Sequence, residues 1–487
     1  MDYKHYDFGL VGLGVMGRNF ILNVADNGFT AIGNDLDEEK VNALKEEGSN
    51  LENVNATVDV KIFTEALSTP RKIMLLVPAG KVVDIVIESL LPHLDKGDLI
   101  IDGGNSFYTD TDRREAYLKE KGINFFGAGV SGGAKGARKG PSIMPGGNQE
   151  AYQHVKPIFE AVSAKYKGEP CVAYLGPKSA GNYVKMVHNG IEYGMMQLTA
   201  EIYDLLKKAA NLSNEELHQI FDRWNKGRLQ SFLVEITAEI FAQKDDLTDG
   251  DLIDVILDKA KQKGTGKWTS QNAMDLGIPI PSIDIAVSMR EISALKDERV
   301  TADEIYDRPD PTGIDKEFLI EEAEKALYFG FIVTYAQGLH QLAEASKEYG
   351  YNLDISEIAK IWRAGCIIRA GLLAEISEAF TNDASLTHLL LAPRIVDKIK
   401  ETVPAARELV SYSVKSGIPL PGISNSINYF NSYTSTRLPL NLIQAQRDHF
   451  GSHTYERLDR EGIFHTEWGV YSEPVNLPEE DSDHKTD

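Results

Sequence analysis

The chain has 487 residues, of which 42% are hydrophobic, 25% charged and 9% aromatic, the composition of a soluble globular protein of about three domains. Its 73 acidic and 51 basic side chains give a net charge of −22, so most of its surface repels nucleic-acid backbones and anionic lipid. Nucleic-acid binding and membrane-surface roles are therefore disfavoured, and an anionic small-molecule substrate needs a local cluster of cations.

Cysteine usage and the N-terminus indicate a compartment. Two cysteines, Cys171 and Cys366, are too few for a disulfide framework or a Cys-rich zinc site, so we expect two buried thiols in a reducing cytosol. Residues 1–7 lack the apolar segment of a secretory signal, and no apolar run approaches the roughly 18 residues of a membrane span. We expect a cytoplasmic protein, and we identify no metal-ligand cluster.

The first 177 residues alternate between short apolar runs and helical patterns. The predicted strands are 6–11, 30–34, 73–77, 99–101 and 171–175, and the predicted helices are 15–26, 81–91 and 110–121, with an acidic helix start at 37–39. Strands joined by crossover helices form a parallel sheet with helices on both faces. The sequence thus predicts an α/β Rossmann-like N-terminal domain.

From residue 178 the pattern is helical, and it repeats. Residues 277–283 recur at 417–423, residues 256–261 recur at 395–400, and Asn211-Leu212 recurs at 352–353, at offsets of 140, 139 and 141. These offsets predict a large all-α domain, 178–438, built from a duplicated helical unit. The segment 439–487 lacks strong periodicity, and we expect its acidic end, 478–487, to be disordered.

A glycine turn follows the first predicted strand and opens the first predicted helix. Its residues are Gly12, Leu13, Gly14, Val15, Met16 and Gly17. Glycines let the backbone approach a pyrophosphate, and Asp35, 23 residues after Gly12, suits the adenosine ribose hydroxyls. A purely structural turn is the alternative for the glycines. For Asp35 the alternative is a cap or turn residue of the next helix, which is compatible with the ribose role. The context favours a dinucleotide site.

Four polar residues, Lys185, His188, Asn189 and Glu192, recur at the spacing of one helix face, with Tyr193 beside them. A solvated face is the usual explanation of such spacing. Asn and His are poor choices for a helix surface, and the glycines at 181, 190 and 194 allow close approach of another backbone or a ligand. The equivalent region of the second copy, 328–342, lacks the pattern, so we favour an acid/base pair with two orienting groups.

Three glycine-rich stretches, 102–106, 127–147 and 263–268, complete the candidate site. The last of them follows an apparent helix. The stretches 127–147 and 263–268 do not have the residue order of a nucleotide-binding P-loop, so the sequence does not indicate ATP hydrolysis. We expect glycine-rich loops that bind an oxyanion or phosphate through backbone amides.

These motifs together resemble the decarboxylating 6-phosphogluconate dehydrogenases over essentially the whole chain. The matching segments are 12–17 (GLGVMG), 101–106 (IDGGNS), 131–133 (SGG), 185–193 (KMVHNGIEY), 263–268 (KGTGKW) and 447–455 (RDHFGSHTY). The resemblance implies oxidative decarboxylation of 6-phospho-D-gluconate to D-ribulose 5-phosphate and CO2, with reduction of NAD(P), in the pentose phosphate pathway. It also implies a homodimer whose C-terminal segment enters the neighbouring subunit.

Matching the motifs residue by residue assigns roles that the resemblance implies. Lys185 would be the general base and Glu192 the general acid. The substrate would be held by Asn105, Ser131, Gly132, Gly133, His188, Asn189, Tyr193, Lys263 and Arg290, and by Arg447 and His453 of the neighbouring subunit. The cofactor would contact residues 12–17, Asn34, Asp35, Leu36, Val77, Pro78, Ala79 and Asn105.

Two positions depart from the family pattern and affect the choice of nucleotide. The family has an arginine for the 2′-phosphate of NADP where this chain has Asp35, and a lysine within the segment that here is Val77-Pro78-Ala79. An added anion and two missing cations weaken NADP by at least a few kcal/mol. NADP is the family default, but we predict NAD preference or dual use.

Two other functions remain as alternatives. A dehydrogenase of another 3-hydroxy acid would share the glycine turn and the lysine helix, but it would not need the cations Lys263, Arg290 and Arg447. A non-catalytic nucleotide-sensing or scaffold dimer would be free to lose Lys185 or Glu192, and both are present.

Overall fold

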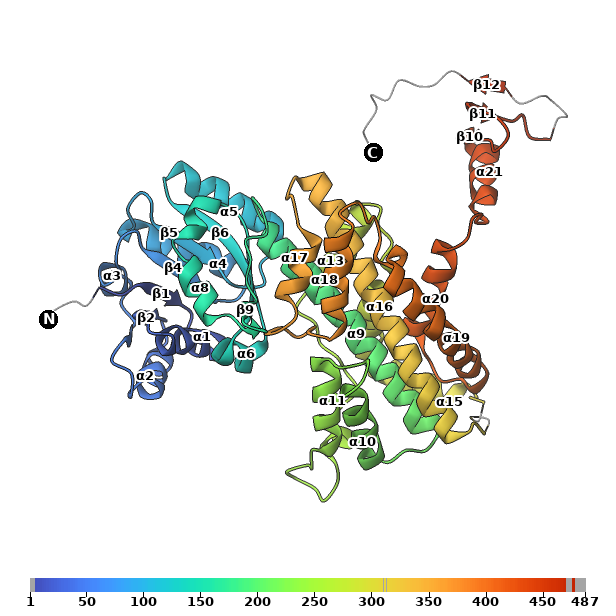
Figure 1. The fold of residues 1–487 in the computed structure, drawn as a ribbon, viewed down its shortest axis with the longest axis horizontal. Helices are drawn as coiled ribbons and strands as arrows, with labels where there is room; N and C mark the ends of the chain where they lie inside the picture. Colours follow the sequence, from blue (N-terminus) through green and yellow to red (C-terminus); the bar gives the residue numbers. More distant parts are fainter. Residues whose placement is uncertain (1–4, 310, 312, 470–474, 478–487) are drawn as a thin grey trace. The chain divides into compact units, whose positions relative to one another are not determined.

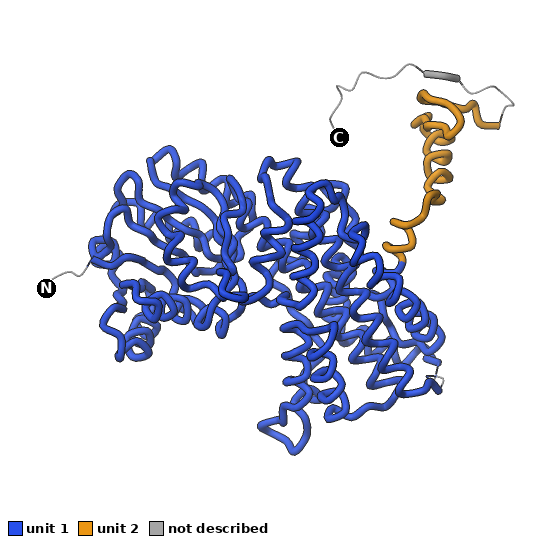
Figure 2. Tube along the Cα trace, in the orientation of Figure 1, with its two compact units in different colours: residues 1–427 blue, residues 428–487 orange. Residues whose placement is uncertain are grey.

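The structure is a computed structural model that describes residues 5–309, 311, 313–469 and 475–477. The chain divides into two compact units, residues 1–427 and 428–487 (Figure 2). Figure 1 labels the elements.

The first unit begins with a seven-stranded sheet of order β3-β2-β1-β4-β5-β6-β7. Its strands are parallel except β7, which runs antiparallel to β6. Their bounds are β1 Phe8–Val11, β2 Ala31–Asn34, β3 Val54–Thr57, β4 Lys72–Leu75, β5 Leu99–Asp102, β6 Asn124–Ser131 and β7 Ser142–Pro145. The order 3-2-1-4-5-6 is that of dinucleotide-binding sheets, which confirms the predicted Rossmann-like fold.

Helices cover both faces of this sheet, and each face has its own core. Along β5, Leu99 and Ile101 pack into one core, with α1 and α8, whereas Ile100 packs into the other, with α3 and α4, as period-2 alternation requires. The helices and short elements are α1 Val15–Asp26, α2 Glu38–Glu47, α3 Val60–Glu65, α4 Lys81–Leu90, η1 Leu91–His93, α5 Tyr108–Glu120, α6 Gly133–Lys139, α7 Gln149–Gln153, α8 Lys156–Val162, β8 Lys165–Tyr166 and β9 Glu169–Pro170.

Two expectations for this part are wrong. The glycine-rich stretch 127–147 is not a loop, because it contains most of β6, all of α6 and all of β7. The predicted closing strand at 171–175 is not formed, and Val172 makes only an isolated bridge to Ile143. Cys171, Val172 and Leu175 are nevertheless buried. The apolar run therefore indicated buried residues, but not a strand with continuous backbone hydrogen bonds.

The rest of the first unit is helical. Its elements are α9 Ala180–Ala209, α10 Asn214–Asn225, α11 Phe232–Ala242, α12 Leu252–Val255, α13 Thr265–Asp275, α14 Pro281–Ala294, α15 Lys296–Ile305, α16 Lys316–Tyr349, α17 Ile355–Ile361, α18 Leu372–Asn382, η2 Leu389–Leu391, α19 Pro393–Ser416 and α20 Pro421–Tyr433. Backbone conformation follows the sequence repeat: Asn211 and Asn352 have φ of 50° and 55°, and Gly277 and Gly417 have φ of 68° and 64°.

The two copies differ at one place where their sequences agree. Residues 395–400 lie inside α19, but residues 256–261 are irregular, so the helix expected before Lys263 is limited to α12. Val255, at the end of α12, and Ile256 and Leu257 of this irregular segment are exposed, so the first copy lacks the packing that stabilises α19. The irregular segment leaves Lys261 and Lys263 free to line the cavity described below.

The second unit contains α21 Leu440–Gly451 and the antiparallel strands β10 Tyr455–Glu456, β11 Ile463–His465 and β12 Val475–Leu477. We expected no strong periodicity here, yet a 12-residue helix forms. Within α21 only Asp448 is buried, so no apolar stripe marks one face. The acidic end at 478–487 lies outside the described residues.

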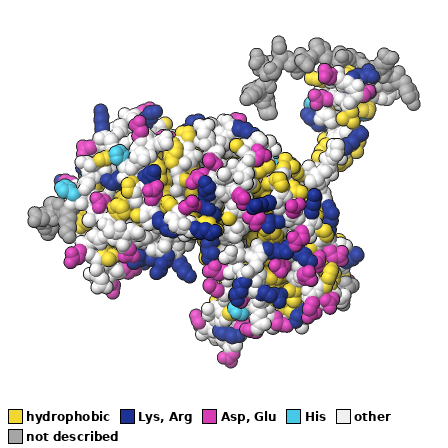
Figure 3. Space-filling view, in the orientation of Figure 1, with side chains coloured by type: hydrophobic (Ala, Val, Ile, Leu, Met, Phe, Trp, Pro, Cys, Tyr) yellow, Lys and Arg dark blue, Asp and Glu magenta, His cyan; other side chains and the backbone are white. Residues whose placement is uncertain are grey.

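Charges of both signs are interspersed on the face drawn in Figure 3. Cys171 and Cys366 are buried free thiols, as expected. Among the described residues, no helix is both long enough and apolar enough to cross a membrane.

Candidate active site

A cavity of about 1070 Å³ lies where the carboxyl ends of the sheet strands meet α9. Open α/β sheets bind ligands at this edge. The wall includes most of the residues predicted from the sequence: Gly14, Val15, Met16, Gly17, Val77, Pro78, Ala79, Asn105, Ser131, Gly132, Gly133, Lys185, Asn189, Glu192, Tyr193, Lys263 and Arg290.

The glycine turn has the shape of a phosphate cradle. Gly12 has φ of 99°, and a Cβ on Gly17 would lie 1.9 Å from the carbonyl oxygen of Gly12, so both positions need glycine for local packing. A Cβ on Gly14 would meet nothing within 4 Å, because this residue faces the cavity. No side chain caps the start of α1 at Gly14, which leaves its amides available to a pyrophosphate.

Asp35 lies at the end of β2 and is tied to the glycine turn. Its Oδ2 accepts from the amide of Leu13 at 2.8 Å, and its Oδ1 accepts from the amide of Asp37 at 3.0 Å. The N-cap of α2 is Asp37, so Asp35 does not cap this helix, but it forms the turn before it, which is the other half of that alternative. Asn34 is buried, and its side-chain Nδ2 donates to the carbonyl oxygen of Thr57, whereas Leu36 is exposed.

Helix α9 is buried on all sides from Ala180 to Ile191, so its polar residues are not a solvated face. Two glycines on one face of β6 make this packing possible. A Cβ on Gly127 would overlap the Asn182 side chain, and a Cβ on Gly129 would lie 2.3 Å from the Cβ of Lys185. The glycines of β6 therefore admit α9 against the sheet and place Lys185 in the wall.

Lys185 and its neighbours form one buried hydrogen-bond network. Nζ donates to Oδ1 of Asn189 at 2.6 Å and lies 3.3 Å from Nδ1 of His188. Nε2 of His188 lies 3.3 Å from Oγ of Ser131, and Nδ2 of Asn189 donates to Oδ1 of Asn105 at 3.4 Å. His188 is fully buried behind the wall of the cavity, so it orients Lys185 and Ser131.

Burial displaces the titration of each acid/base group in this network. It lowers the pKa of Lys185, against the opposing attraction of Glu192. It raises the pKa of the Glu192 carboxyl, although Lys185 and Arg290 favour the carboxylate. Burial and the nearby Lys185 hold the pKa of His188 well below its usual value. All three shifts act towards the uncharged forms of these groups, the neutral amine, the neutral imidazole and the protonated carboxyl.

Cationic side chains and the N-terminus of α13 lie together at the other end of the cavity. The Arg290 guanidinium lies over the ring of Tyr193, with its carbon 3.5 Å from the ring centre, and Nη1 donates to the carbonyl of Lys261 at 3.1 Å. Lys261, Lys263 and Thr265, the first residue of α13, also line this end. This end suits a phosphate group.

Several wall residues were not identified from the sequence. Lys261 and Gln262 belong to the irregular segment, and Met196 extends the face of Glu192 by one turn. Ile367 comes from the turn before α18, and its amide donates to Oγ of Ser131 at 3.4 Å. The α9 spacing could have indicated Met196, but no local pattern marks Ile367.

Arg447 and His453 lie in the second unit. Arg447 is on α21, where Nη1 donates to Oε1 of Gln444 at 3.2 Å, and the ring of His453 lies 6.0 Å from that of Phe450. Neither residue is among those that line the cavity of the first unit.

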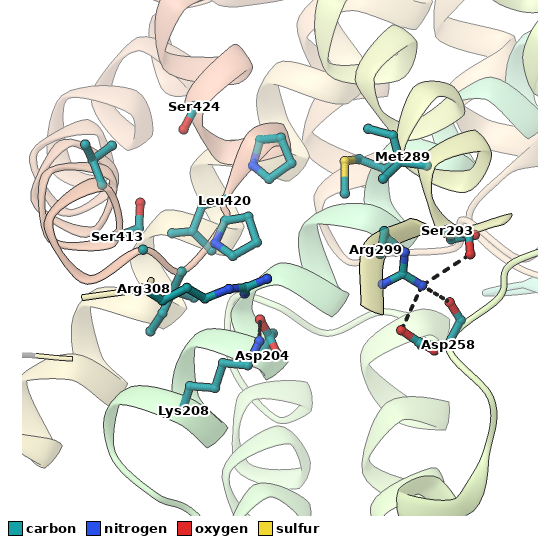
Figure 4. Close-up of a pocket in the computed structure, with 16 residues that line it drawn as sticks. Asp204, Lys208, Asp258, Met289, Ser293, Arg299, Arg308, Ser413, Leu420 and Ser424 are labelled. Atoms are coloured by element: carbon teal, nitrogen blue, oxygen red, sulfur yellow. Dashed lines mark hydrogen bonds and ion pairs between the residues drawn. The ribbon is translucent and has the colours of Figure 1, made fainter. Parts of the chain in front are cut away.

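A second cavity, of about 780 Å³, lies among the helices and differs in its charges. Figure 4 shows Arg299 and Lys208 bonded to Asp258 and Asp204. Arg308 in turn pairs with Asp303 at 2.8 Å. The cationic side chains of this second cavity are thus neutralised by neighbouring acidic side chains. Within the described part of the chain, no three His, Cys, Asp or Glu side chains are grouped so as to hold a metal ion.

Known proteins were compared with the whole chain. The family model for the NAD binding domain of 6-phosphogluconate dehydrogenase matches residues 7–176, and that for the C-terminal domain matches residues 181–468. The NADP(+)-dependent decarboxylating 6-phosphogluconate dehydrogenase of Bacillus subtilis is 52% identical over 94% of this chain and 98% of its own length. The decarboxylating enzyme of Escherichia coli K12 is 53% identical over the same shares.

A solved structure matches as well. The 6-phosphogluconate dehydrogenase of Plasmodium falciparum, determined in apo form and with NADP+ or 6-phosphogluconate, has a TM-score of 0.91 and 45% identity, covering 95% of this chain and all of that one. The chain therefore belongs to the decarboxylating 6-phosphogluconate dehydrogenase family.

Proposed function

We propose that the chain catalyses the oxidative decarboxylation of 6-phospho-D-gluconate to D-ribulose 5-phosphate and CO2, with reduction of a nicotinamide dinucleotide. The observation that supports this function most directly is the single cavity wall shared by the glycine turn, Lys185, Glu192 and the cationic end. The bound dinucleotide would supply the hydride acceptor for C3 of the sugar acid.

Lys185 is the proposed general base. A neutral amine has two N–H groups, and Oδ1 of Asn189 and Nδ1 of His188 accept one each. Its lone pair then remains free to take the proton of the C3 hydroxyl as hydride leaves C3. The resulting ammonium donates to the C3 carbonyl oxygen of the 3-keto acid, which stabilises the enediolate formed as CO2 departs.

Glu192 is the proposed general acid. It lies seven residues, or roughly 10 Å of helix rise, beyond Lys185 on the same face of α9. The side chains nevertheless converge, because Nδ1 of His188 lies 3.3 Å from Nζ of Lys185 and 4.0 Å from Oε2 of Glu192, so base and acid can act at the neighbouring carbons C3 and C2 of the sugar acid. Desolvation raises the pKa of Glu192 and so favours its protonated form, which would deliver a proton to C2 of the sugar acid, the carbon that becomes C1 of ribulose 5-phosphate.

The remaining residues orient the substrate. His188 accepts at Nδ1 from Lys185, which favours the tautomer that donates from Nε2 to Ser131. The Ser131 hydroxyl is then free to donate to the carboxylate of the substrate. Asn105, Gly132 and Gly133 line the same end, and Tyr193, Lys263 and Arg290 would hold the phosphate.

The active form is a proposed homodimer in which Arg447 and His453 complete the neighbour's site. We divide the chain accordingly into a dinucleotide-binding domain (1–177), a helical substrate and dimerisation domain (178–438) and a reaching tail (439–487). Co-expression of Lys185→Met with Arg447→Gln tests this arrangement, because a mixed dimer contains one intact site. Each variant alone should be inactive, and activity should be recovered when the two are co-expressed. Co-expressed variants that remain inactive would contradict the shared site.

The proposed cofactor is NAD in preference to NADP. In the family pattern Asp35 takes the place of the arginine for the 2′-phosphate, and Val77, Pro78 and Ala79 supply no cation to the cavity wall. We expect kcat/KM with NAD to exceed that with NADP by roughly 100-fold, the equivalent of a few kcal/mol. A large advantage for NADP would refute this preference. Location in the cytoplasm stays a prediction.

Turnover is the direct test of the function. Purified protein supplied with 6-phosphogluconate and either dinucleotide should produce reduced nicotinamide, followed by its absorbance, together with an equal amount of CO2. A 3-hydroxy acid without phosphate should be turned over poorly. Reduction without CO2 release, or equal rates with both substrates, would contradict the proposal.

A further inference from the structure

A buried arginine lies beneath the two loops that form the cofactor side of the cavity. One loop, 77–80, follows β4, and the other, 103–106, follows β5. Arg114 projects from α5 with only 1% of its side chain exposed. It is not itself in the cavity wall, so any effect on the reaction must pass through these loops.

All five N–H groups of Arg114 have acceptors. Nε donates to Oδ1 of Asp84 at 2.8 Å, and Nη2 donates to Oδ2 of Asp84 at 3.2 Å and to the carbonyl of Gly80 at 2.9 Å. Nη1 donates to Oδ2 of Asp102 and Oγ of Ser106, both at 3.4 Å. A guanidinium alone among side chains offers five donors in one rigid plane.

These acceptors belong to both loops. Gly80 ends the first loop at φ of 86°, next to α4. Asp102, at the end of β5, is fully buried, and its Oδ1 accepts from the amide of Gly104 in the second loop. One planar group therefore fixes the Gly80 carbonyl relative to the backbone of the second loop.

The second loop continues the connection to the catalytic helix. The carbonyl of Gly104 accepts from Nδ2 of Asn182 at 3.3 Å, and Oδ1 of Asn105 accepts from Asn189 at 3.4 Å. Asn189 in turn accepts from Lys185. Arg114, the cofactor loops and the proposed base thus form one continuous polar network.

The neighbouring Arg113 provides a comparison within the same helix. It also binds Asp84, at 3.0 Å, but its side chain is 55% exposed and its other acid partner is Asp110 on its own helix. An exposed ion pair of this kind contributes little. The two arginines share a charge, a helix and an acid partner, and differ in the contacts with Gly80, Asp102 and Ser106.

We propose that Arg114 is a positioning residue that sets the 77–80 loop against the 103–106 loop, and so aligns the dinucleotide with the sugar acid at Lys185. A misplacement of about 1 Å in such a site costs on the order of 100-fold in rate. Arg114→Lys keeps the charge but replaces the planar fork by one ammonium, which cannot reach all the acceptors.

The test compares Arg114→Lys with Arg113→Lys by steady-state kinetics, using 6-phosphogluconate with hydrogen or deuterium at C3. Arg114→Lys should lower kcat by roughly 10-fold or more and raise the isotope effect on kcat, because hydride transfer becomes slower. Its KM for 6-phosphogluconate should change by less than about 3-fold, since the phosphate end is untouched. Arg113→Lys should stay within about 2-fold of the parent in both constants.

Unchanged kcat and isotope effect in Arg114→Lys, or equal losses in the two variants, would overturn the proposal. If Arg114→Lys does not fold, Ser106→Ala decides, because it removes one acceptor and leaves the charges in place. A several-fold fall in kcat with a raised isotope effect supports the proposal, and parent values overturn it. The inference rests on the proposed function, but failure of that function would abolish turnover by the parent protein, which this comparison requires.

Discussion

The two copies of the helical unit show how a duplicated scaffold acquires one catalytic site. The long helices α9 and α16 cross where Gly194 meets Thr334, residues 140 apart that occupy equivalent places in the two copies. At the same offset of 140 residues, Lys325 is the sequence equivalent of Lys185. Tyr328, Phe329 and Ile332 take the places of His188, Asn189 and Glu192. Lys325 pairs with Glu321 and Glu322 on its own helix.

The neighbours of the two helices explain this difference. Helix α9 packs against β6 of the sheet, whereas α16 packs against α19. Of the two long helices it is therefore α9 whose side chains line the cavity, and the second copy contributes Ile367 from a turn. The repeat supplies the rigid frame, and the polar network has formed where that frame touches the dinucleotide-binding sheet.

Each long helix also caps one of a pair of equivalent helices, α14 and α20, in the other copy, with different chemistry. Glu201 of α9 accepts from the amides of Gly422 and Ile423 at the start of α20, at 2.6 and 3.0 Å. Gln337 of α16 accepts from the amide of Ser282 at the start of α14 at 3.0 Å. One cap can therefore ionise and the other cannot.

The largest expected effect separates the two equivalent lysines. Lys185→Met should lower kcat by about 10³-fold or more, because it removes the proposed base, while Lys325→Met should stay within about 2-fold of the parent. Both are measured as reduction of the dinucleotide at saturating substrate. Comparable losses in the two variants would place the chemistry elsewhere than on α9.

Glu192→Gln should have the next largest effect, a fall in kcat of roughly 100-fold. Lys185 must be unprotonated to act, so the parent rate should fall as the pH drops through its lowered pKa. Glu192 must be protonated, so the rate should also fall as the pH rises through its raised pKa. The pH profile of the variant should lose only the alkaline fall. If Glu192→Gln retains the fall in rate at alkaline pH, another group is responsible for that fall.

The two caps predict a difference in stability with pH. Burial raises the pKa of Glu201 to about 7, from 4.5 in the unfolded chain, so the folded state binds its proton more tightly. The free energy of unfolding should therefore fall by about 3 kcal/mol as the pH rises from 4.5 towards 8. Glu201→Gln makes this cap resemble that of Gln337 and should remove this fall, measured by urea denaturation at several pH values. An identical pH dependence in the variant would contradict the assignment.

The smallest effect concerns the crossing of the two copies. A Cβ on Gly194 would lie 2.6 Å from Cγ2 of Thr334, so Gly194→Ala should lower the free energy of unfolding by about 1 to 3 kcal/mol. Gly313→Ala is the control, since that residue is exposed and has nothing within 4 Å of an added Cβ. Equal thermal unfolding of the two variants would show that the helices separate easily at this point.

Much of this fold could be predicted from the sequence where one physical cause controlled the pattern. The helix at 15–26 begins and ends as predicted, and the predicted strands near β1, β2, β4 and β5 are present, because a parallel sheet buries every position of its strands. Strand β6 was missed because its glycines serve the approach of α9, a contact with residues more than 50 positions away.

The site could be predicted only in part, for a related reason. Lys185, Asn189 and Glu192 share a helix face, so their spacing alone indicated a common location. Ile367 reaches Ser131 from a turn 236 residues further along the chain, and Arg114 lies under two loops without any local pattern. Such contacts depend on tertiary packing, which spacing along one helix does not report.

The most direct test of the acid/base account is a crystal structure of the protein with 6-phosphogluconate and an oxidised dinucleotide. The account predicts that the C3 hydroxyl lies within about 3.2 Å of Nζ of Lys185, that the Glu192 carboxyl faces C2, and that the phosphate lies beside Arg290. A sugar acid bound with its C3 hydroxyl turned away from Lys185, or bound outside this cavity, would contradict it.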